Sequence, residues 1–367
     1  MKRVCFLFNV AAHYRLPIYT LLGSKLDSDI YVGDKMRFNL KKLDYKKLPG
    51  FRKVFHNIFF GPFYWQKGAL KLIRKRYVYF VTVGDVYCLS TWLILLCSRI
   101  FHYRVVSWTH GIYGKESKLK EKIKLFYFRL HYHIMTYGEY GRQQTIKAGI
   151  PESKVTAIGN SLDSDRNIEL RTHLKPSKIY VDHFGNTFPT ILYCGRIQKI
   201  KRLDMILNAV ADLNKDKQRI NVTFVGADND NVNLNVIAKS MGIEDNVWFY
   251  GPCYNDAILA ELFYNAHICV SPGNVGLTSI HALSFGCPVI THDNFKNQMP
   301  EFEAIRKGIT GDFFKEGCQE DLNLKIMNWI SKTSDERDMV RTMAYKDIDS
   351  FWNIHSQFSK ISKILSR

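Results

Sequence analysis

Residues 267–290 read HICVSPGNVGLTSIHALSFGCPVI and decide how the fold is interpreted. An apolar run ends in Ser-Pro-Gly, a loop with a second glycine follows, and a stretch of helical spacing leads into another apolar run. This arrangement is typical of phosphate-binding turns, because glycine permits close backbone approach and a helix N-terminus favours an anion. An ordinary strand-to-helix turn has the same spacing, so this segment alone leaves both interpretations open.

Short β-branched runs alternate with segments of helical periodicity on both sides of this stretch. The runs include VYFVTVGD, YRVVSW and HIMTY in the first half, and TILYCG, INVTFVG, NVWFYG and PVITHD in the second. Alternating strands and helices predict parallel sheets covered on both faces. We therefore expect an α/β protein with two Rossmann-like units, joined by a polar linker at residues 161–187.

The net charge of +18 is divided unevenly along the chain. Residues 1–160 contain 28 Lys or Arg and 9 Asp or Glu, a balance of +19, whereas residues 161–367 contain 24 and 25, a balance of −1. Such asymmetry predicts that one domain faces an anionic partner and that the other has a different task. A membrane surface, an anionic lipid or nucleic acid is consistent with this charge.

Several classes of protein are disfavoured by composition. The eight cysteines lie mostly in apolar strand-like runs without metal-finger spacing, which predicts reduced core thiols in a cytosolic protein. The apolar run VCFLFNVAA near the N-terminus contains Asn9, so we interpret it as a first core strand rather than a signal peptide. The most apolar internal stretch, CLSTWLILLCSRIF, is interrupted by Arg99 and is too short to span a bilayer, which predicts a buried helix.

A second anion-binding segment is YCGRIQKIKRLDMILNA, which turns at Gly195 between a strand and an apolar helix. Four cations precede the helix: Arg196, Lys199, Lys201 and Arg202. Arg can clamp a diphosphate through its planar fork and Lys as a point charge, although such clusters also occur at solvated helix starts. Two anion-binding edges in one Rossmann-like unit favour a nucleoside-diphosphate ligand.

The order of five segments resembles the donor-binding domain of the retaining GT-B glycosyltransferases of family 4. These segments are GRIQKIKRLD, VTFVG, VWFYGP, CVSPGNVGLTSIHALSFGCPVI and PEFEAIRKGITGDFF, and the resemblance covers about residues 155–320. It implies an α/β GT-B architecture in which two Rossmann-like domains face a cleft. It also implies that Arg196 and Lys201 hold the donor diphosphate and that the Val275–Thr278 turn supplies backbone N–H groups to the phosphates.

The chain departs from this family at the two places that usually hold Glu, where it has Gly273 and His281. In the family one Glu contacts the donor sugar and the other the ribose hydroxyls. A His can hydrogen-bond a ribose hydroxyl or lie against a base, so we expect His281 to face the nucleoside, with a core histidine as the alternative. The expected donor-binding residues are Gly195, Arg196, Lys201, Gly273, Asn274, Val275, Gly276, Leu277, Thr278 and His281.

The first half offers candidate acceptor and catalytic residues. His110 follows the strand YRVVSW, where the resemblance implies a histidine beside the reacting sugar carbon; a hydrogen-bonded loop histidine is the alternative. After the first strand the chain has His13, Tyr14 and Arg15 instead of the family's glycine-rich loop, and these suit an acceptor or its phosphate. The expected catalytic residues are His110, Arg196 and Lys201.

The resemblance also suggests how the chain is divided. The segment IGNSLD near residue 160 resembles the Asn-Gly-x-Asp turn that closes the family's first domain. We expect an acceptor- and membrane-facing domain at 1–165 and a nucleotide-sugar donor domain at 166–340. The remaining residues, 341–367, have helical spacing and are expected to pack back toward the first domain.

Two further patterns concern metal and membrane. Asp228 and Asp230 end the strand INVTFVG, as in metal-dependent glycosyltransferases of the other major fold, but Arg196 and Lys201 would already neutralise the diphosphate, so no metal or other cofactor is expected. Three runs combine basic and aromatic residues: NLKKLDYKKLPGFRKVF, QKGALKLIRKRY and KLKEKIKLFYFRLHYH. One run is usually a solvated face, but three in one domain predict attachment to an anionic membrane surface.

Together these patterns predict a cytoplasmic glycosyltransferase, peripheral on the inner face of the membrane. It would move a hexose-like sugar, with retention, from a UDP- or GDP-type donor to a lipid-linked or polysaccharide acceptor, as in capsule or O-antigen synthesis. The leaving diphosphate would take the acceptor proton. No nucleic-acid partner is expected, because no recognition-helix, zinc or RNA-platform motif occurs. A non-catalytic two-domain nucleotide- or sugar-binding protein is the alternative, since the Glu pair is missing.

Overall fold

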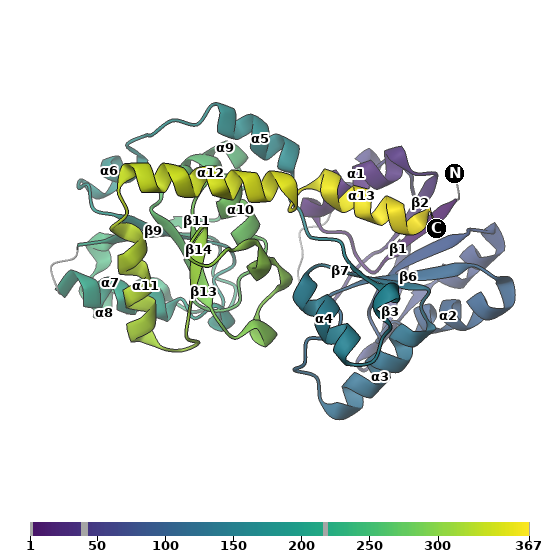
Figure 1. The fold of residues 1–367 in the computed structure, drawn as a ribbon. Coiled ribbons are helices and arrows are strands. Elements are labelled where there is room, and N and C mark those ends of the chain that lie inside the picture. Colours follow the sequence, from purple (N-terminus) through teal and green to yellow (C-terminus); the bar gives the residue numbers. More distant parts are fainter. Residues whose placement is uncertain (1–2, 38–42, 216–218, 367) are drawn as a thin grey trace. The chain divides into compact units, whose positions relative to one another are not determined.

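The computed structural model describes residues 3–37, 43–215 and 219–366, which form two α/β units (Figure 1). Unit 1 comprises Met1–Asp163 and Phe351–Arg367, and unit 2 comprises Ser164–Ser350. The first division falls two residues before the end of the expected domain at 1–165. We expected the second division at residue 340, but unit 2 extends to Ser350. The reason is that the helix α12 (Ser334–Ser350) runs through residue 340 without a break.

The sheet of unit 1 has the strand order β4-β3-β2-β1-β5-β6-β7-β8. Its neighbouring strands are parallel, except for the antiparallel hairpin of β3 and β4. The strands are β1 (Val4–Phe8), β2 (Ser28–Gly33), β3 (Phe51–Phe60), β4 (Phe63–Lys67), β5 (Tyr79–Val83), β6 (Arg104–Thr109), β7 (His133–Thr136) and β8 (Val155–Ala157). The residues of β1, β2 and β7 are buried throughout, as a sheet covered on both faces requires.

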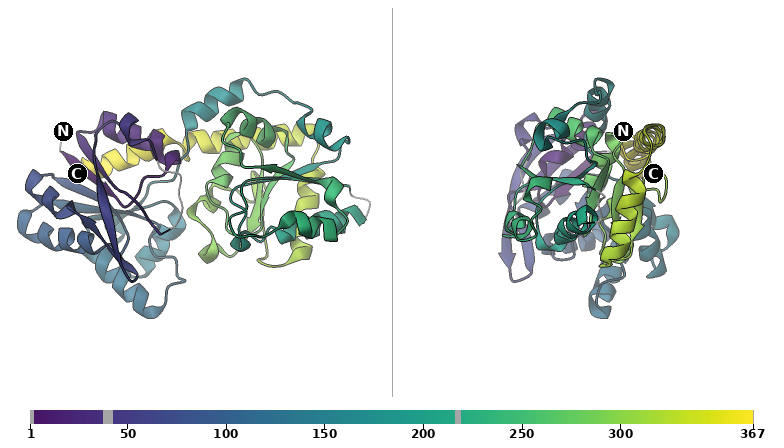
Figure 2. Two further views of the ribbon diagram at one scale, coloured as in Figure 1. Left: turned by 180° about the vertical axis from the view of Figure 1, so that it is seen from behind. Right: turned by 90° about the vertical axis from the view of Figure 1, so that its left-hand side faces the viewer.

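Helices cover both faces of this sheet: α1 (Leu16–Lys25), α2 (Leu89–Phe101), α3 (Lys118–Leu130), α4 (Glu139–Lys147) and α13 (Ile354–Leu365). The C-terminal helix α13 lies side by side with α1 in unit 1, as Figures 1 and 2 show. These two helices share one core with β1, and α2 and α3 share another on the opposite face. The expectation that residues 88–101 form a buried helix is wrong in part, because α2 lies on the sheet and only its inner face is covered.

The sheet of unit 2 is parallel throughout and has the order β11-β10-β9-β12-β13-β14. Its strands are β9 (Thr190–Cys194), β10 (Asn221–Val225), β11 (Val247–Gly251), β12 (Ile268–Ser271), β13 (Val289–His292) and β14 (Gly311–Phe314). Besides α12, its helices are α5 (Ser164–Thr172), α6 (Ile179–Phe184), α7 (Asp204–Lys215), α8 (Leu234–Ser240), α9 (Asp256–Asn265), α10 (Thr278–Ser284) and α11 (Gln319–Ile330). The predicted α/β class with two Rossmann-like sheets is therefore confirmed.

The expected linker at 161–187 is mostly helical, since α5 and α6 both lie within unit 2. The eight cysteines are free thiols, four of them buried and four half-buried. Among residues 3–37, 43–215 and 219–366, no helix is long and apolar enough to cross a membrane.

Candidate functional site

Two loops meet where the strand order of unit 2 reverses, between β9 and β12. The reversal point of an open parallel sheet is where ligands bind, beyond the carboxyl ends of the strands. The loop after β9 carries residues 195–201, and the loop after β12 carries residues 272–277. The Gly273 N–H donates to the Lys201 carbonyl at 2.8 Å, and Thr278 Oγ1 donates to the Cys194 carbonyl at 2.8 Å. The two segments that the sequence singled out are thus hydrogen-bonded to each other.

Gly273 is required by the close approach of these loops. A Cβ at this position would lie 2.2 Å from the Ile200 carbonyl oxygen and 2.6 Å from Lys201 Cα, both of which are backbone atoms. A glutamate therefore has no room at 273 in this conformation. Gly276 differs, because the nearest atom to a Cβ there is Met299 Cγ at 4.0 Å.

Arg196 and Lys201 place two positive charges beside this turn. The Lys201 Nζ donates to both the carbonyl oxygen and Oδ1 of Asn274 at 2.6 Å, which fixes its position. Desolvation and the neighbouring charge of Arg196 lower the pKa of Lys201 to about 8, and the carboxylate of Glu301 partly opposes them. Arg196 is exposed, and no described residue accepts a hydrogen bond from its guanidinium. A bound anion would relieve the repulsion between these two cations.

Backbone N–H groups of the turn differ in their availability. The Val275 N–H donates to Gln298 Oε1 at 2.8 Å, so it is already engaged. The N–H groups of Gly276, Leu277 and Thr278 donate to no residue in the described part of the chain. Of the four N–H groups expected to bind phosphate, three therefore remain open at the start of α10.

Gln298 is a site residue that sequence reasoning missed. Its side chain is buried, and its Nε2 donates to Thr291 Oγ1 at 2.8 Å and to the His292 carbonyl at 2.9 Å. Its Oε1 accepts from the Val275 N–H. It therefore anchors the turn to β13. No local signal marks this role, because Gln298 lies 23 residues from the turn that it holds.

His281 lies one turn into α10 and is half-buried. Its ring packs against Phe263 and Phe285, at centroid distances of 4.9 and 5.5 Å. Desolvation lowers its pKa to about 4, with Asp256 partly opposing, so the ring is neutral at pH 7. This packing and desolvation fit the alternative of a core histidine as well. The nucleoside contact stays a prediction.

In unit 1, His110 follows β6 at the carboxyl edge of the sheet, as expected. Its ring lies 4.9 Å from the ring of Tyr137 and keeps an exposed surface. Desolvation and the positive charges of Arg15, Lys124 and Lys115 lower its pKa to about 4. A neutral imidazole can both donate to and accept from sugar hydroxyl groups, so the side chain suits a ligand at this edge.

The three residues His13, Tyr14 and Arg15 form a short 3-10 helix after β1, in which the Tyr14 ring lies 5.6 Å from the His13 ring and from the Arg15 guanidinium. His13 is exposed, whereas Arg15 is buried and its Nη1 donates to Asn160 Oδ1 at 2.6 Å. The Arg15 guanidinium also lies 4.9 Å from the ring of Tyr137. Arg15 thus ties the loop after β1 to the IGNSLD turn.

Asp85 is a second candidate that sequence reasoning missed. It follows Gly84 at the end of β5, and Gly84 donates its N–H to the Trp108 carbonyl of β6 at 3.0 Å. The parallel register of β5 and β6 ends with Val83 opposite Trp108, and the chain then turns, because the Asp85 N–H donates to the Val83 carbonyl at 2.8 Å. Burial raises the pKa of Asp85, although its hydrogen bonds with the Tyr87 N–H and Tyr64 oppose this shift. The signal was present in VTVGD, a strand that ends in a carboxylate.

Asp228 and Asp230 organise a loop. The carboxylate of Asp228 accepts from the N–H groups of Asp230, Val232 and Asn233, and that of Asp230 accepts from the Lys199 N–H. Within the described ranges, no three His, Cys, Asp or Glu side chains gather as a metal site.

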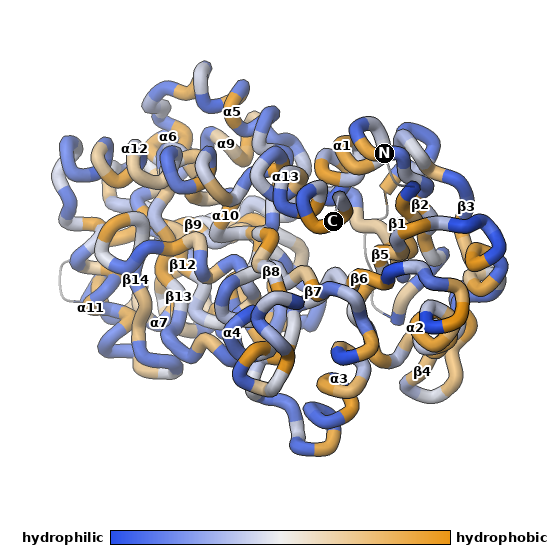
Figure 3. Tube along the Cα trace, turned by 45° about the vertical axis from the view of Figure 1, so that its right-hand side comes forward, coloured by the Kyte–Doolittle hydropathy of each residue, from blue (hydrophilic) through white to orange (hydrophobic). Residues whose placement is uncertain are grey.

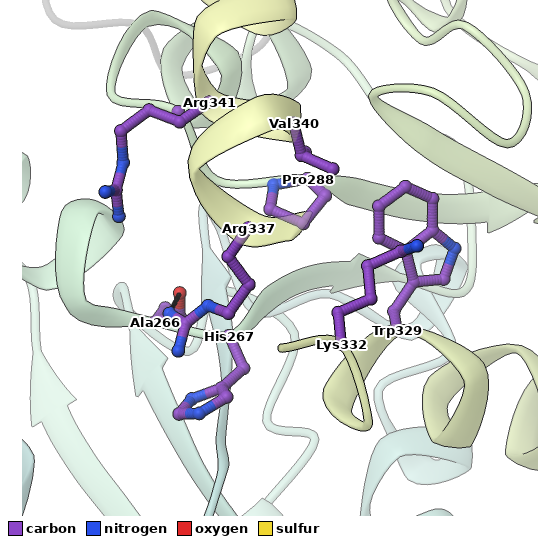
Figure 4. Close-up of a pocket in the computed structure, with 9 residues that line it drawn as sticks. Ala266, His267, Pro288, Trp329, Lys332, Arg337, Val340 and Arg341 are labelled. Atoms are coloured by element: carbon purple, nitrogen blue, oxygen red, sulfur yellow. Dashed lines mark hydrogen bonds between the residues drawn. The ribbon is translucent and has the colours of Figure 1, made fainter. Parts of the chain in front are cut away.

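Figure 4 shows a pocket of unit 2 that contains none of the predicted site residues. Arg337 and Arg341 enter it from α12 and each donates to a carbonyl at the C-terminal end of α9, that of Ala266 and that of Tyr264, at 3.2 Å. The last carbonyls of a helix have no partners within it and favour cations. Capping of α9 therefore explains these two arginines.

Comparison with known proteins finds similarity to glycosyl transferases within unit 2. Residues 181–347 match the family model "Glycosyl transferases group 1". A D-inositol 3-phosphate glycosyltransferase of Streptomyces bingchenggensis (strain BCW-1) is 34% identical over 111 residues, which are 27% of this chain and 24% of that protein. This chain spans about a quarter of the length of that curated relative, and 37% and 33% of two others of the same name.

Solved structures match the whole chain. Anabaena Alr3699/HepE in complex with UDP has a TM-score of 0.75 and 16% identity, with all of both chains covered. The lipopolysaccharide outer core galactosyltransferase WaaB has a TM-score of 0.72 and 14% identity, with 99% of both chains covered. At these identities the likeness establishes the fold, which is that of the GT-B glycosyltransferases.

Proposed function

We propose that the chain is a retaining glycosyltransferase that moves a sugar from a nucleoside-diphosphate donor to a glycan or lipid-linked acceptor. The observation that carries this is the pair of hydrogen-bonded loops at the reversal point of unit 2, where Arg196 and Lys201 lie beside three open N–H groups. The match of residues 181–347 to group 1 glycosyl transferases supports the reaction class. Two structures of similar fold are complexes with UDP and UDP-glucose, which supports a uridine donor.

In the proposed reaction the bond between the anomeric carbon and the donor phosphate oxygen breaks, and a bond to the acceptor oxygen forms on the same face. The acceptor proton passes to the departing phosphate oxygen, so the diphosphate leaves with its charge partly neutralised. Arg196 and Lys201 stabilise the negative charge that develops on that oxygen, and the N–H groups of the Gly276–Thr278 turn hold the phosphates. No metal enters the proposal, because the two cations supply the positive charge.

Unit 1 would bind the acceptor at the carboxyl edge of its sheet. There neutral His110 follows β6 and Asp85 follows the neighbouring strand β5, and a carboxylate can accept a hydrogen bond from a sugar hydroxyl. The charge of residues 1–160 favours a lipid-linked acceptor and a peripheral place on the inner, cytoplasmic face of a membrane. Glycans such as capsule or O-antigen are the corresponding products.

The test measures release of free nucleoside diphosphate from a panel of UDP- and GDP-sugars, with and without acceptor. The double variant Arg196→Ala/Lys201→Ala should lose roughly a hundred- to a thousandfold in turnover, because preorganised charge contacts contribute on this scale. Lys199→Ala is the matched control, since it removes an exposed cation from the same loop and should keep near-normal turnover.

Two outcomes would contradict the proposal. Near-normal turnover in the double variant would show that the phosphates bind elsewhere. Tight binding of a nucleotide sugar without any release would instead support a non-catalytic binding protein, the alternative that the missing glutamates raise.

A further inference from the structure

Two helices on the outside of unit 1 expose apolar side chains in helical register. On α2, Leu93, Leu96 and Ile100 recur at spacings of three and four residues, and Leu96 and Ile100 are 51% and 70% exposed. The inner face of the same helix buries Ile94 and Leu95 against the sheet. The helix is therefore apolar on both faces, although a surface helix is normally polar on the side turned to water.

The next helix, α3, repeats this pattern. Leu119, Ile123 and Phe126 lie on one side of it, and Leu119 and Phe126 are 70% and 57% exposed. Its inner face buries Tyr127 and Phe128. A repeated outward stripe on two neighbouring helices is not explained by the core, since each helix already has an inner face that fills it.

The two stripes are continuous in space. The rings of Trp92 on α2 and Phe126 on α3 stack at 6.1 Å, and Figure 3 shows α2, α3 and β4 side by side. We call the residues Leu93, Leu96, Ile100, Leu119, Ile123 and Phe126 the α2–α3 face. Large exposed apolar patches mark sites where a protein meets another protein or a membrane.

Positive charge surrounds this face. Residues 60–130 contain 13 Lys or Arg and only 3 Asp or Glu. Exposed cations on the two helices are Arg99, Lys118, Lys120, Lys122 and Arg129. Of the three acids, Glu116 is paired with Lys124 at 2.7 Å. Little negative charge therefore offsets the cations.

We propose that the α2–α3 face docks onto an anionic phospholipid bilayer, with its apolar side chains at the boundary of the acyl chains and its lysines at the lipid phosphates. An apolar stripe flanked by Lys and Arg is the pattern that binds membrane surfaces. A second copy of this chain fits less well, because pairing the same face would bring like charges together. In the proposed function this face would bring unit 1 to a lipid-linked acceptor. Docking itself requires neither a bound donor nor sugar transfer.

The experiment is flotation of the full chain with phosphatidylcholine vesicles and with vesicles that also contain phosphatidylglycerol, without nucleotide. The chain should float with the anionic vesicles and detach as salt rises. The variant Lys118→Gln/Lys120→Gln/Lys122→Gln should bind roughly a hundredfold more weakly, at about fivefold for each lysine near the surface. Leu96→Gln/Ile100→Gln/Ile123→Gln should lose at least about tenfold, since three apolar insertions are removed.

The matched control is Val236→Gln/Leu324→Gln/Met339→Gln, which changes three exposed apolar residues of unit 2 and should float like the unchanged chain. Melting temperatures of all variants should be nearly unchanged, because each side chain is exposed. Equal loss in the control, or no preference for anionic vesicles, would overturn the proposal. A concentration-dependent dimer that only the α2–α3 variant abolishes would assign the face to a second copy instead. Nucleotide release is measured in the same variants. Loss of flotation with unchanged release is a failure of docking, whereas loss of release is a failure of the proposed reaction.

Discussion

At the scale of single residues, Gly273 has the most restrictive environment in the candidate site. Its N–H is bonded to the Lys201 carbonyl, and a Cβ would meet backbone atoms of Ile200 and Lys201 that no rotamer change can move. Replacing Gly273 by any residue with a side chain must therefore move the loop after β12 away from the loop after β9. Since the two loops together form the proposed phosphate site, we expect the cost to appear in nucleotide affinity.

Gly273→Ala should weaken UDP binding by about tenfold or more, equivalent to about 1.4 kcal/mol. It should also destabilise unit 2 by roughly 1–3 kcal/mol, the usual cost of overpacking. Isothermal titration and thermal unfolding measure the two effects. Ile200→Ala is the control, because it shortens an exposed side chain of the same loop without adding atoms and should change neither quantity much. Equal affinity in both variants would show that contact between the loops does not shape the site.

Lys201 gives a prediction about pH. Its pKa is lowered to about 8 in the free protein, and a bound diphosphate should raise it. Below pH 8 the lysine is already charged in both states, so affinity should not depend on its titration there. Above pH 8 the free protein loses this proton and binding must restore it, so UDP affinity should fall by about tenfold per pH unit until the pKa of the bound state is reached.

Titrations between pH 7 and 9.5 in two buffers of different ionisation enthalpy would reveal this proton uptake. Lys201→Arg is the control, because guanidinium stays charged throughout this range and should remove the slope. A slope that survives in Lys201→Arg would belong to another group.

At the scale of elements, sequence reasoning was most successful where the pattern is local. Alternating apolar runs located the strands β9, β10, β12 and β13, and glycines located the turns that follow β9 and β12. Parallel topology then brought those turns together, because both strands end at the same edge of one sheet. The meeting of these two turns was thus predictable without knowledge of any long-range contact.

The features that the sequence did not predict depend on contacts between distant segments. Gln298 reaches Val275 from another loop, and Asp85 comes to the same edge of the sheet as His110 only because β5 pairs with β6. The apolar residues of α2 predict a buried helix, but only one face of α2 is covered. The sequence does not tell how many faces of an apolar helix are covered. His281 shows the same limit, since its helical position was predictable but its packing against Phe263 was not.

At the scale of the whole molecule, the two units have different chemistry. Residues 1–160 carry the excess positive charge and the α2–α3 face, whereas the nearly neutral residues 161–367 include the nucleotide-site candidates. Unit 1 is nevertheless not continuous in sequence, because the chain returns to it at Phe351. The returning helix α13 buries Ile354, Ile361 and Ile364 in the core that also contains α1. Its Gln357 accepts from Ser161 Oγ at 2.8 Å and donates to the Gly159 carbonyl at 2.7 Å.

Ending the chain at Ser350 should therefore destabilise unit 1 selectively. Each fully buried Ile of α13 contributes roughly 1.5–3 kcal/mol, so losing several of them should lower the melting temperature of unit 1 strongly or unfold it. Unit 2 should still bind UDP, and UDP should raise the melting temperature of its transition as in the full chain. Calorimetry with and without UDP distinguishes the two transitions. Lys363→Gln, on the exposed side of α13, is the control and should leave both unchanged. If truncation abolished UDP binding or lowered both transitions equally, the returning helix would support the whole molecule rather than unit 1.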